Sequence, residues 1–162
     1  MDSKSKIKVR EATTDDAADI HKLARELAAT VGDDPPVEEA VRARLEELLE
    51  ASRTRVLVVE YESGVVGAAS FWIKPDLAHG DTVVEMPMLV VAEDHRRTGV
   101  GRLLMEEVRS IASDNGASQI ELVATSTNVV AREFYRSLGF VEADVVSLEF
   151  VGSQGDPPQP EQ

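Results

Sequence analysis

The alternation of apolar and polar positions predicts a strand at the start of the chain and two helices after it. Residues Ile7 to Ala12, "IKVREA", alternate in the manner of a half-buried strand. The next segment, Thr13 to Asp16, resembles a capping box, and apolar residues then recur at helical spacing as far as Val31. The stretch "GDDPP" at 32–36 breaks this helix, and a second helix is predicted over Val37 to Ala51.

The middle of the chain is rich in valine and predicts extended structure. The segment 55–73 is interpreted as a hairpin of two strands, with a tight turn near Ser63 and Gly64. A loop follows over Lys74 to Asp81. A long apolar strand then covers Thr82 to Ala92, and its valine content disfavours a helix.

The second half of the chain predicts two helices and two further strands. The first helix follows residue 99 and ends at Asn115-Gly116, a pair typical of a left-handed helix cap. A strand is predicted over 118–124, a short helix over 128–138, and a final strand, or two, over 140–150. The last residues, 152–162, are polar and rich in proline and glycine, so we expect them to be disordered.

This order of elements predicts one α/β (α+β) domain over residues 1–151. The first half supplies antiparallel strands, and the second half adds a β-α-β crossover. The predicted sheet is therefore mixed and mostly antiparallel, with helices on both faces. A chain of 162 residues is long enough to bury one complete core.

Composition and charge narrow the functional classes. The chain has no cysteine, which excludes disulfides, thiolate nucleophiles and cysteine-ligated zinc, and no other metal site is predicted. Its formal net charge of −13 argues against nucleic-acid binding and is compatible with attraction of cationic amines, although solubility explains the charge as well. Neither a signal peptide nor a membrane span is visible, so we expect a cytoplasmic protein without a membrane partner.

The stretch "HRRTGVGRLL", residues 95–104, has the chemistry of an anion site at a helix entrance. The first amides of a helix lack partners inside the helix, and the helix dipole adds partial positive charge there. Gly99 and Gly101 carry no Cβ atoms that would keep an anion from these amides, and Arg96 and Arg97 add positive charge. Neither a dinucleotide-binding fingerprint nor a Walker loop matches, so NAD and ATP are poor candidates.

Two motifs together give the chain a family resemblance. The pattern Arg96-x-x-Gly99-x-Gly101 follows a predicted strand and precedes an amphipathic helix. The segment "NVVAREFYRSLGF", from Asn128 to Phe140, forms a second pattern, Asn-x-x-Ala-x-x-Phe-Tyr-x-x-x-Gly-Phe. The pair resembles the acetyl-CoA signature of the GNAT superfamily of N-acetyltransferases, and the resemblance covers nearly the whole chain in element order.

The resemblance implies an acetyl-CoA site. It assigns the pyrophosphate to the loop amides, pantetheine to the strand at Met88 to Val91, and a bulge to that strand, where Pro87 fits a disturbed ladder. Asn128 is implied to contact the pantetheine arm and also suits a helix N-cap. The implied acetyl-CoA-binding residues are Met88, Leu89, Val90, Val91, Arg96, Arg97, Thr98, Gly99, Val100, Gly101, Asn128 and Tyr135. Arg97 replaces a frequent glycine of the family, and an exposed salt bridge is an equal alternative for its role.

Catalytic roles also follow from the resemblance. Tyr135 matches the general acid that protonates the departing CoA thiolate; the alternative is a half-buried aromatic residue with a bonded hydroxyl. Glu85, an acid inside an apolar strand, matches a catalytic glutamate that burial would make more basic, or else is a solvated or salt-bridged glutamate. His79 and a water molecule remain alternatives for the base, and His95 is expected to orient the phosphate loop.

The sequence therefore predicts an acetyl-CoA-dependent N-acetyltransferase that acts by direct attack of a primary amine. The alternative is a GNAT-like domain that binds acyl-CoA without turnover, and larger acyl donors stay open. The acceptor is a small-molecule amine or a peptide or protein amine. Four acids, Asp33, Asp34, Asp76 and Asp81, are expected near the acceptor. The resemblance also allows a homodimer through the final strands.

Overall fold

The computed structural model describes residues 6–62 and 64–149. Its strands are β1 (Ile7–Glu11), β2 (Thr54–Tyr61), β3 (Gly64–Asp76), β4 (Asp81–Val91) and β5 (Gln119–Glu121). Its helices are α1 (Ala17–Val31), α2 (Glu38–Glu50), α3 (Val100–Asp114) and α4 (Val129–Ser137), with short 3₁₀ turns η2 (Thr14–Asp16) and η3 (Glu93–His95). Within the described residues, we find no helix with the length and apolar character needed to span a bilayer.

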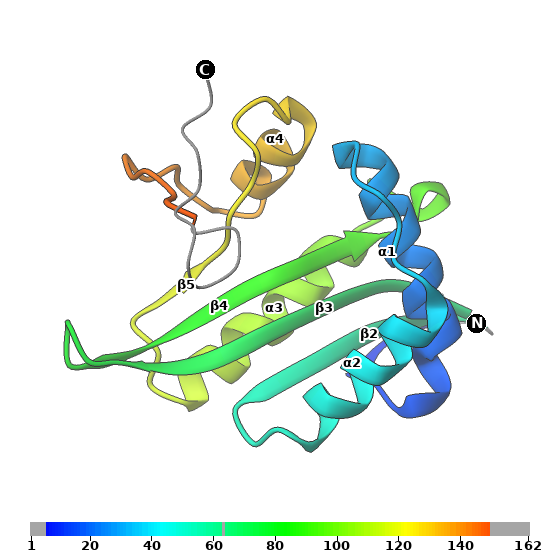
Figure 1. Ribbon diagram of the computed structural model, residues 1–162, viewed down its shortest axis with the longest axis horizontal. Helices are drawn as coiled ribbons and strands as arrows, with labels where there is room; N and C mark the ends of the chain where they lie inside the picture. Colours follow the sequence, from blue (N-terminus) through cyan, green and yellow to red (C-terminus); the bar gives the residue numbers. More distant parts are fainter. Residues whose placement is uncertain (1–5, 63, 150–162) are drawn as a thin grey trace, which may run out of the picture.

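The five strands form one sheet in the order β1-β2-β3-β4-β5 (Figure 1). The first four pair antiparallel in sequence order, and β5 pairs parallel with β4. A parallel neighbour requires a crossover, and α3 supplies it between β4 and β5. The predicted mixed, mostly antiparallel sheet with a β-α-β crossover is confirmed.

Helices cover both faces of the sheet, as expected. On one face, α1 and α2 bury Ile20, Leu23 and Leu45 against alternate residues of β2 and β3. On the other face, α3 buries Leu104 and Val108 against the remaining strand residues, and α4 packs at the edge of the same cluster. Figure 1 shows α3 behind the sheet and α1 and α2 in front of it. Both sheet faces are apolar because both are covered.

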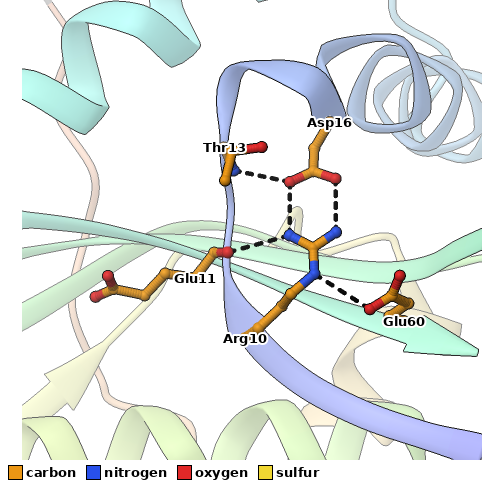
Figure 2. Close-up of polar contacts among 5 residues, drawn as sticks. All are labelled: Arg10, Glu11, Thr13, Asp16 and Glu60. Atoms are coloured by element: carbon orange, nitrogen blue, oxygen red, sulfur yellow. Dashed lines mark hydrogen bonds and ion pairs between the residues drawn. The ribbon is translucent and has the colours of Figure 1, made fainter.

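An arginine at the end of β1 fixes the start of α1 (Figure 2). The guanidinium of Arg10 donates to both carboxylate oxygens of Asp16 at 2.8 Å and to Glu60 at 3.3 Å. The amide of Thr13 also donates to Asp16 at 2.8 Å, which is half of the predicted capping box. Asp16 is 5% exposed, and the Arg10 guanidinium lowers the pKa of this buried carboxyl.

Three element predictions need correction. Strand β3 runs on to Asp76, so the loop predicted from Lys74 is shorter, because the antiparallel ladder with β4 continues to Asp81. Strand β5 covers only 119–121 of the predicted 118–124. The final strand predicted over 140–150 is absent from its described part, residues 140–149, where no neighbouring strand offers hydrogen bonds and Leu148 is 91% exposed. Ser63 and the predicted disordered tail, 152–162, lie outside the described residues.

Candidate functional site

Strand β4 has the predicted irregularity at Pro87, and its pairing with β5 ends just before that residue. Ser70 of β3 pairs with Met88, whereas Trp72 pairs with Glu85, so two residues of β4 face one of β3. The parallel pairing with β5 ends at Glu85 and Glu121. Among the described residues, no strand pairs with the outer edge of β4 beyond that point. We refer to this unpaired stretch of β4, residues 86–91, as the open edge of β4.

The ladder shows which amides face this open edge. The amide of Ala92 donates to the carbonyl of Val66, near the start of β3, at 2.8 Å. Val91 of β4 is paired with Gly67 of β3. Hydrogen-bonded and non-bonded pairs alternate along an antiparallel ladder, so the amides of Leu89 and Val91 point away from β3. The side chains of both residues are buried in the core on the α3 face. Of the four residues predicted to bind pantetheine through their backbone, 88–91, Leu89 and Val91 are thus the two whose amides point to the open edge.

The loop between β4 and α3 presents a run of free amides. Within the described residues, the amides from Arg97 to Arg102 donate to no protein acceptor, whereas Leu103 donates to Gly99 at 3.0 Å. Gly99 has a φ of 90°, and a Cβ there would meet open space. Arg97 has a φ of 61°, a left-handed conformation that glycine adopts more easily than arginine does. The loop has the free donors and the access that an anion requires.

Side chains near this loop hold its shape. Arg96 turns back to β4, where its Nε donates to the Val91 carbonyl at 3.3 Å. The Thr98 hydroxyl donates to the His95 carbonyl, and the His95 ring packs on Tyr61 with a centroid distance of 5.4 Å. Thr98 is therefore engaged within the loop through the His95 backbone, and the expected orienting role of the His95 side chain stays a prediction. Sequence reasoning missed Glu26, whose carboxylate accepts from the Glu93 amide at 3.2 Å across 67 residues of chain, a separation that no local motif reveals.

The missing side chain of Gly101 also makes room for a packing contact that sequence did not suggest. A Cβ at this position would lie 2.6 Å from Cζ of Phe134, so the bare backbone receives an aromatic ring of α4. Gly101 is buried, whereas Gly99 is exposed. The space beside Gly99 is open and can admit an anion. Phe134 fills the space beside Gly101 and thereby packs α4 against α3.

Tyr135 lies next to this junction in the sequence and packs on the core beneath α4. Tyr135 follows Phe134 in α4, and the two rings lie 5.4 Å apart. The Tyr135 ring also meets Phe140 edge-on at 5.8 Å. Tyr135 packs against the cluster that includes Leu89 and Val91. Burial raises the pKa of the Tyr135 hydroxyl above its ordinary value, so the phenol keeps its proton at neutral pH.

Asn128 lies at the start of α4 beside a cleft. Its side chain accepts from the Ala131 amide at 3.1 Å, which confirms the N-cap interpretation. The cleft, about 320 Å³ in volume, separates the end of α1 from the loop before α4. Its lining is uncharged and consists of Thr30, Val31, Thr125, Thr127, Asn128, Val129 and Val130. A space of this size accepts a small group or part of a larger ligand.

Glu85 and Tyr135 lie on opposite faces of the sheet. Val84 and Met86 belong to the core on the α3 face, so strand alternation turns Glu85 to the α1 and α2 face. The Glu85 side chain is 42% exposed and forms an ion pair with Lys74 of β3, which raises the pKa of Lys74. Glu85 is therefore only partly buried, not buried as the catalytic interpretation expected. Its contacts are those of the alternative, a salt-bridged glutamate.

His79 lies at the far end of β4. It precedes the strand, and because a strand rises about 3.3 Å per residue it lies roughly 25 Å from Met88. Its Nδ1 is 2.6 Å from Asp76 Oδ2, and this contact raises the pKa of His79. Asp81 accepts from the Ser118 hydroxyl at 2.7 Å in the same region. The structure thus does not bring His79, Asp76 or Asp81 to the open edge of β4.

Comparison with known proteins adds the family. A family model described as "Acetyltransferase (GNAT) family" matches residues 17–140. Streptothricin acetyltransferase of Streptomyces lavendulae is 33% identical over 66 residues, which cover 41% of this chain and 35% of that protein. The match thus spans about a third of the length of this curated relative.

Solved structures share the fold. One described as a possible acetyltransferase from Clostridium difficile 630 has a TM-score of 0.79 and 21% identity, covering 91% of this chain and 98% of that one. An aminoglycoside N-acetyltransferase in complex with CoA has a TM-score of 0.77 and 20% identity, covering 88% of this chain and 93% of that one. Identity at this level carries the fold and leaves the substrate open.

Proposed function

The chain belongs to the GNAT family of acetyltransferases, and on this premise we propose that it transfers an acetyl group from acetyl-CoA to a primary amine. The observation that carries the proposal is the continuity of one surface. The open edge of β4 leads into the free amides from Arg97 to Arg102, and Tyr135 lies on the neighbouring helix. A thioester, a diphosphate and a departing sulfur each find suitable groups along this path.

The donor is proposed to lie along the open edge of β4. The loop amides and the start of α3 would bind the diphosphate of CoA, since unpaired amides and a helix dipole favour phosphate. The amides of Leu89 and Val91 would accept the pantetheine arm in the manner of an added strand. Arg96, which already contacts the Val91 carbonyl, would add charge between the two segments.

Transfer is proposed to proceed by direct attack. The acceptor ammonium first loses one proton to a base. The neutral nitrogen then forms a bond to the thioester carbonyl carbon, whose oxygen becomes an oxyanion, and the nitrogen releases its second proton to solvent. An outward amide of Leu89 or Val91 donates to that oxygen. When the oxyanion collapses, the carbon–sulfur bond breaks and the sulfur leaves with the electron pair. The O–H bond of Tyr135 then breaks and its proton passes to sulfur, after which solvent reprotonates the phenolate.

Two candidates remain for the base. Glu85 faces the side of the sheet opposite Tyr135, which suits a base that receives a proton from an amine approaching from that side. Its partner Lys74 would have to yield to the incoming ammonium. A water molecule is the alternative. Comparing Glu85→Gln with Lys74→Met separates the two: a base role requires the first variant to lose the alkaline rise of kcat/KM and the second to keep it.

The acceptor is proposed to be a cationic small-molecule amine. The net charge of −13 attracts cations, and Gly32 alone separates Asp33 and Asp34 from the α1 residues that line the cleft. The streptothricin acetyltransferase and the aminoglycoside N-acetyltransferase named above both point to amines of this class. Polyamines, amino acids, peptide N-termini and lysine side chains form the rest of the panel to be screened.

The decisive experiment measures CoA release from acetyl-CoA over this amine panel, together with CoA binding by calorimetry. Tyr135→Phe is expected to lower kcat by about 100-fold or more with little change in CoA affinity. Tyr61→Phe is the matched control, because Tyr61 is the other of the two tyrosines and its ring contact with His95 survives the change. CoA binding without release by any amine would identify a binding module, and absence of CoA binding would end the proposal.

A further inference from the structure

Helix α4 carries the proposed general acid, yet it is held by few contacts. The helix has nine residues, and none of them is fully buried. Phe134 anchors its middle against Gly101, near the start of α3. The position of the Tyr135 hydroxyl therefore depends on how the C-terminal end of α4 is held as well.

A Schellman turn closes that end. The Gly139 amide donates to the Arg136 carbonyl and the Phe140 amide to the Tyr135 carbonyl, both at 3.0 Å. Gly139 has a φ of 97°, which a side chain would make costly. The turn folds the Phe140 ring back against Tyr135, with a centroid distance of 5.8 Å. The geometry of this turn thus sets one wall of the Tyr135 environment.

Arg109 of α3 reaches over this turn. Its guanidinium donates to the carbonyl of Leu138, the C-cap of α4, and Leu138 is 7% exposed. Carbonyls at a helix end lack partners within the helix and carry partial negative charge, so a cation there is favourable. A Cβ on Gly139 would lie 2.9 Å from the Arg109 Nη2 atom. Gly139 is therefore needed twice, for its φ and for the passage of the guanidinium.

These contacts tie α4 to α3 at two places. Gly101 receives Phe134, and about two helical turns further along α3, Arg109 receives the end of α4. Two separated contacts fix the direction of a helix, whereas one contact leaves it free to pivot. Tyr135 lies between the two.

We infer that Arg109 is a positioning residue for the transfer reaction, which it serves by holding the α4 C-terminus so that the Tyr135 hydroxyl meets the departing sulfur. The inference rests on the proposed role of Tyr135 as the acid. The same pairing explains why a glycine stands at position 139 of the second sequence motif, a point that the acetyl-CoA signature alone left without a physical reason.

The test is Arg109→Met, which keeps an unbranched side chain similar to the aliphatic part of arginine and removes the donors and the charge. We expect kcat to fall by roughly 10- to 100-fold while KM for acetyl-CoA changes by less than about threefold, because a misplaced acid weakens the transition state and leaves donor binding intact. Arg109→Lys, which retains a cation and a donor, should recover part of kcat. Arg44→Met on α2 is the matched control, since among the described residues Arg44 forms an ion pair with Glu47 alone.

A double variant separates positioning from general loss of structure. In the Tyr135→Phe background, Arg109→Met should cause little further loss of kcat, because the group it positions is already gone. Ultraviolet titration should place the phenol of Tyr135 closer to the ordinary pKa of tyrosine in Arg109→Met, with Tyr135→Phe used to assign the signal. Full additivity of the two losses, or an unchanged kcat in Arg109→Met, overturns the inference. If Tyr135→Phe itself keeps its rate, the proposed acid fails instead.

Discussion

Replacing Gly101 by alanine probes the junction between α3 and α4. The new Cβ would lie 2.6 Å from Cζ and 2.9 Å from Cε2 of Phe134. Carbon atoms in van der Waals contact are about 3.5–4.0 Å apart, so the ring must retreat by roughly 1 Å. Because Tyr135 is the next residue in the same helix, its hydroxyl moves with the ring.

The size of the effect follows from two opposing contributions. Forcing an extra methyl group into a packed contact costs about 1–3 kcal/mol. Alanine in place of glycine within a helix contributes about 1 kcal/mol in the stabilising direction. The net change in the free energy of unfolding is therefore a loss of about 0–2 kcal/mol. A displacement of about 1 Å at a catalytic group costs up to about 100-fold in rate, so kcat should suffer more than stability.

Urea unfolding and steady-state CoA release together measure both quantities. In Gly101→Ala, kcat should fall while KM for acetyl-CoA stays near its original value. Adding Phe134→Leu removes the clashing ring atoms and should restore the lost free energy of unfolding. If Gly101 instead admits a phosphate, KM for acetyl-CoA rises and the second substitution brings no recovery. Unchanged stability and unchanged kcat in the single variant would refute the packing argument altogether.

Three further predictions concern the loop, the buried ion pair and the end of α2. Gly99→Ala strains a residue with a φ of 90° and should raise KM for acetyl-CoA, whereas Gly32→Ala, with a φ of 78° and open surroundings, should lose similar stability without a kinetic effect. Arg10→Met leaves the Asp16 carboxylate buried without its cation and should cost about 3–5 kcal/mol at pH 7. Because the pKa of Asp16 is lowered in the folded state, this stabilisation is complete above about pH 4 and is lost as the pH falls further, so urea midpoints of the two proteins should converge in acid. Thr54→Val removes a 2.6 Å hydrogen bond from the buried Thr54 hydroxyl to the Leu48 carbonyl in the last turn of α2 and should lower the free energy of unfolding by about 1–3 kcal/mol in the same assay.

The opposite placement of Glu85 and Tyr135 has a consequence for the reaction. If the thioester lies on the open edge of β4, as proposed, it is accessible from both faces of the sheet. The amine can then approach from the α1 and α2 face while the sulfur departs toward α4. The uncharged cleft at Thr30 and Asn128 lies between the two helices that flank this edge. Variants on the α1 and α2 face should therefore change KM for the acceptor, and variants on the α4 side should change kcat.

Most of the secondary structure was predictable because its causes are local. The spacing of Ile20, Leu23 and Leu27 specified α1, and the Asn115-Gly116 pair specified the end of α3, where Gly116 has a φ of 67°. The irregularity in β4 was implied by the family resemblance, and Pro87 fits it because proline lacks the amide that a regular ladder requires. The alternation over 140–149 misled, because an alternating pattern predicts a strand only where a neighbouring edge offers hydrogen bonds.

From sequence alone, the fold family and the order of elements as far as α4 were predictable, and an anion site in the loop at 96–101 and an acid role for Tyr135 were proposed. Each of these depends on residues close together in the chain, so spacing carries the information. Other features became visible only in three dimensions. These are the outward direction of two amides of β4 and the packing of Phe134 beside Gly101. The ion pair of Lys74 with Glu85 and the hydrogen bond from Arg109 to the end of α4 are of the same kind. These contacts join segments distant in sequence, and packing between elements, rather than local pattern, selects them.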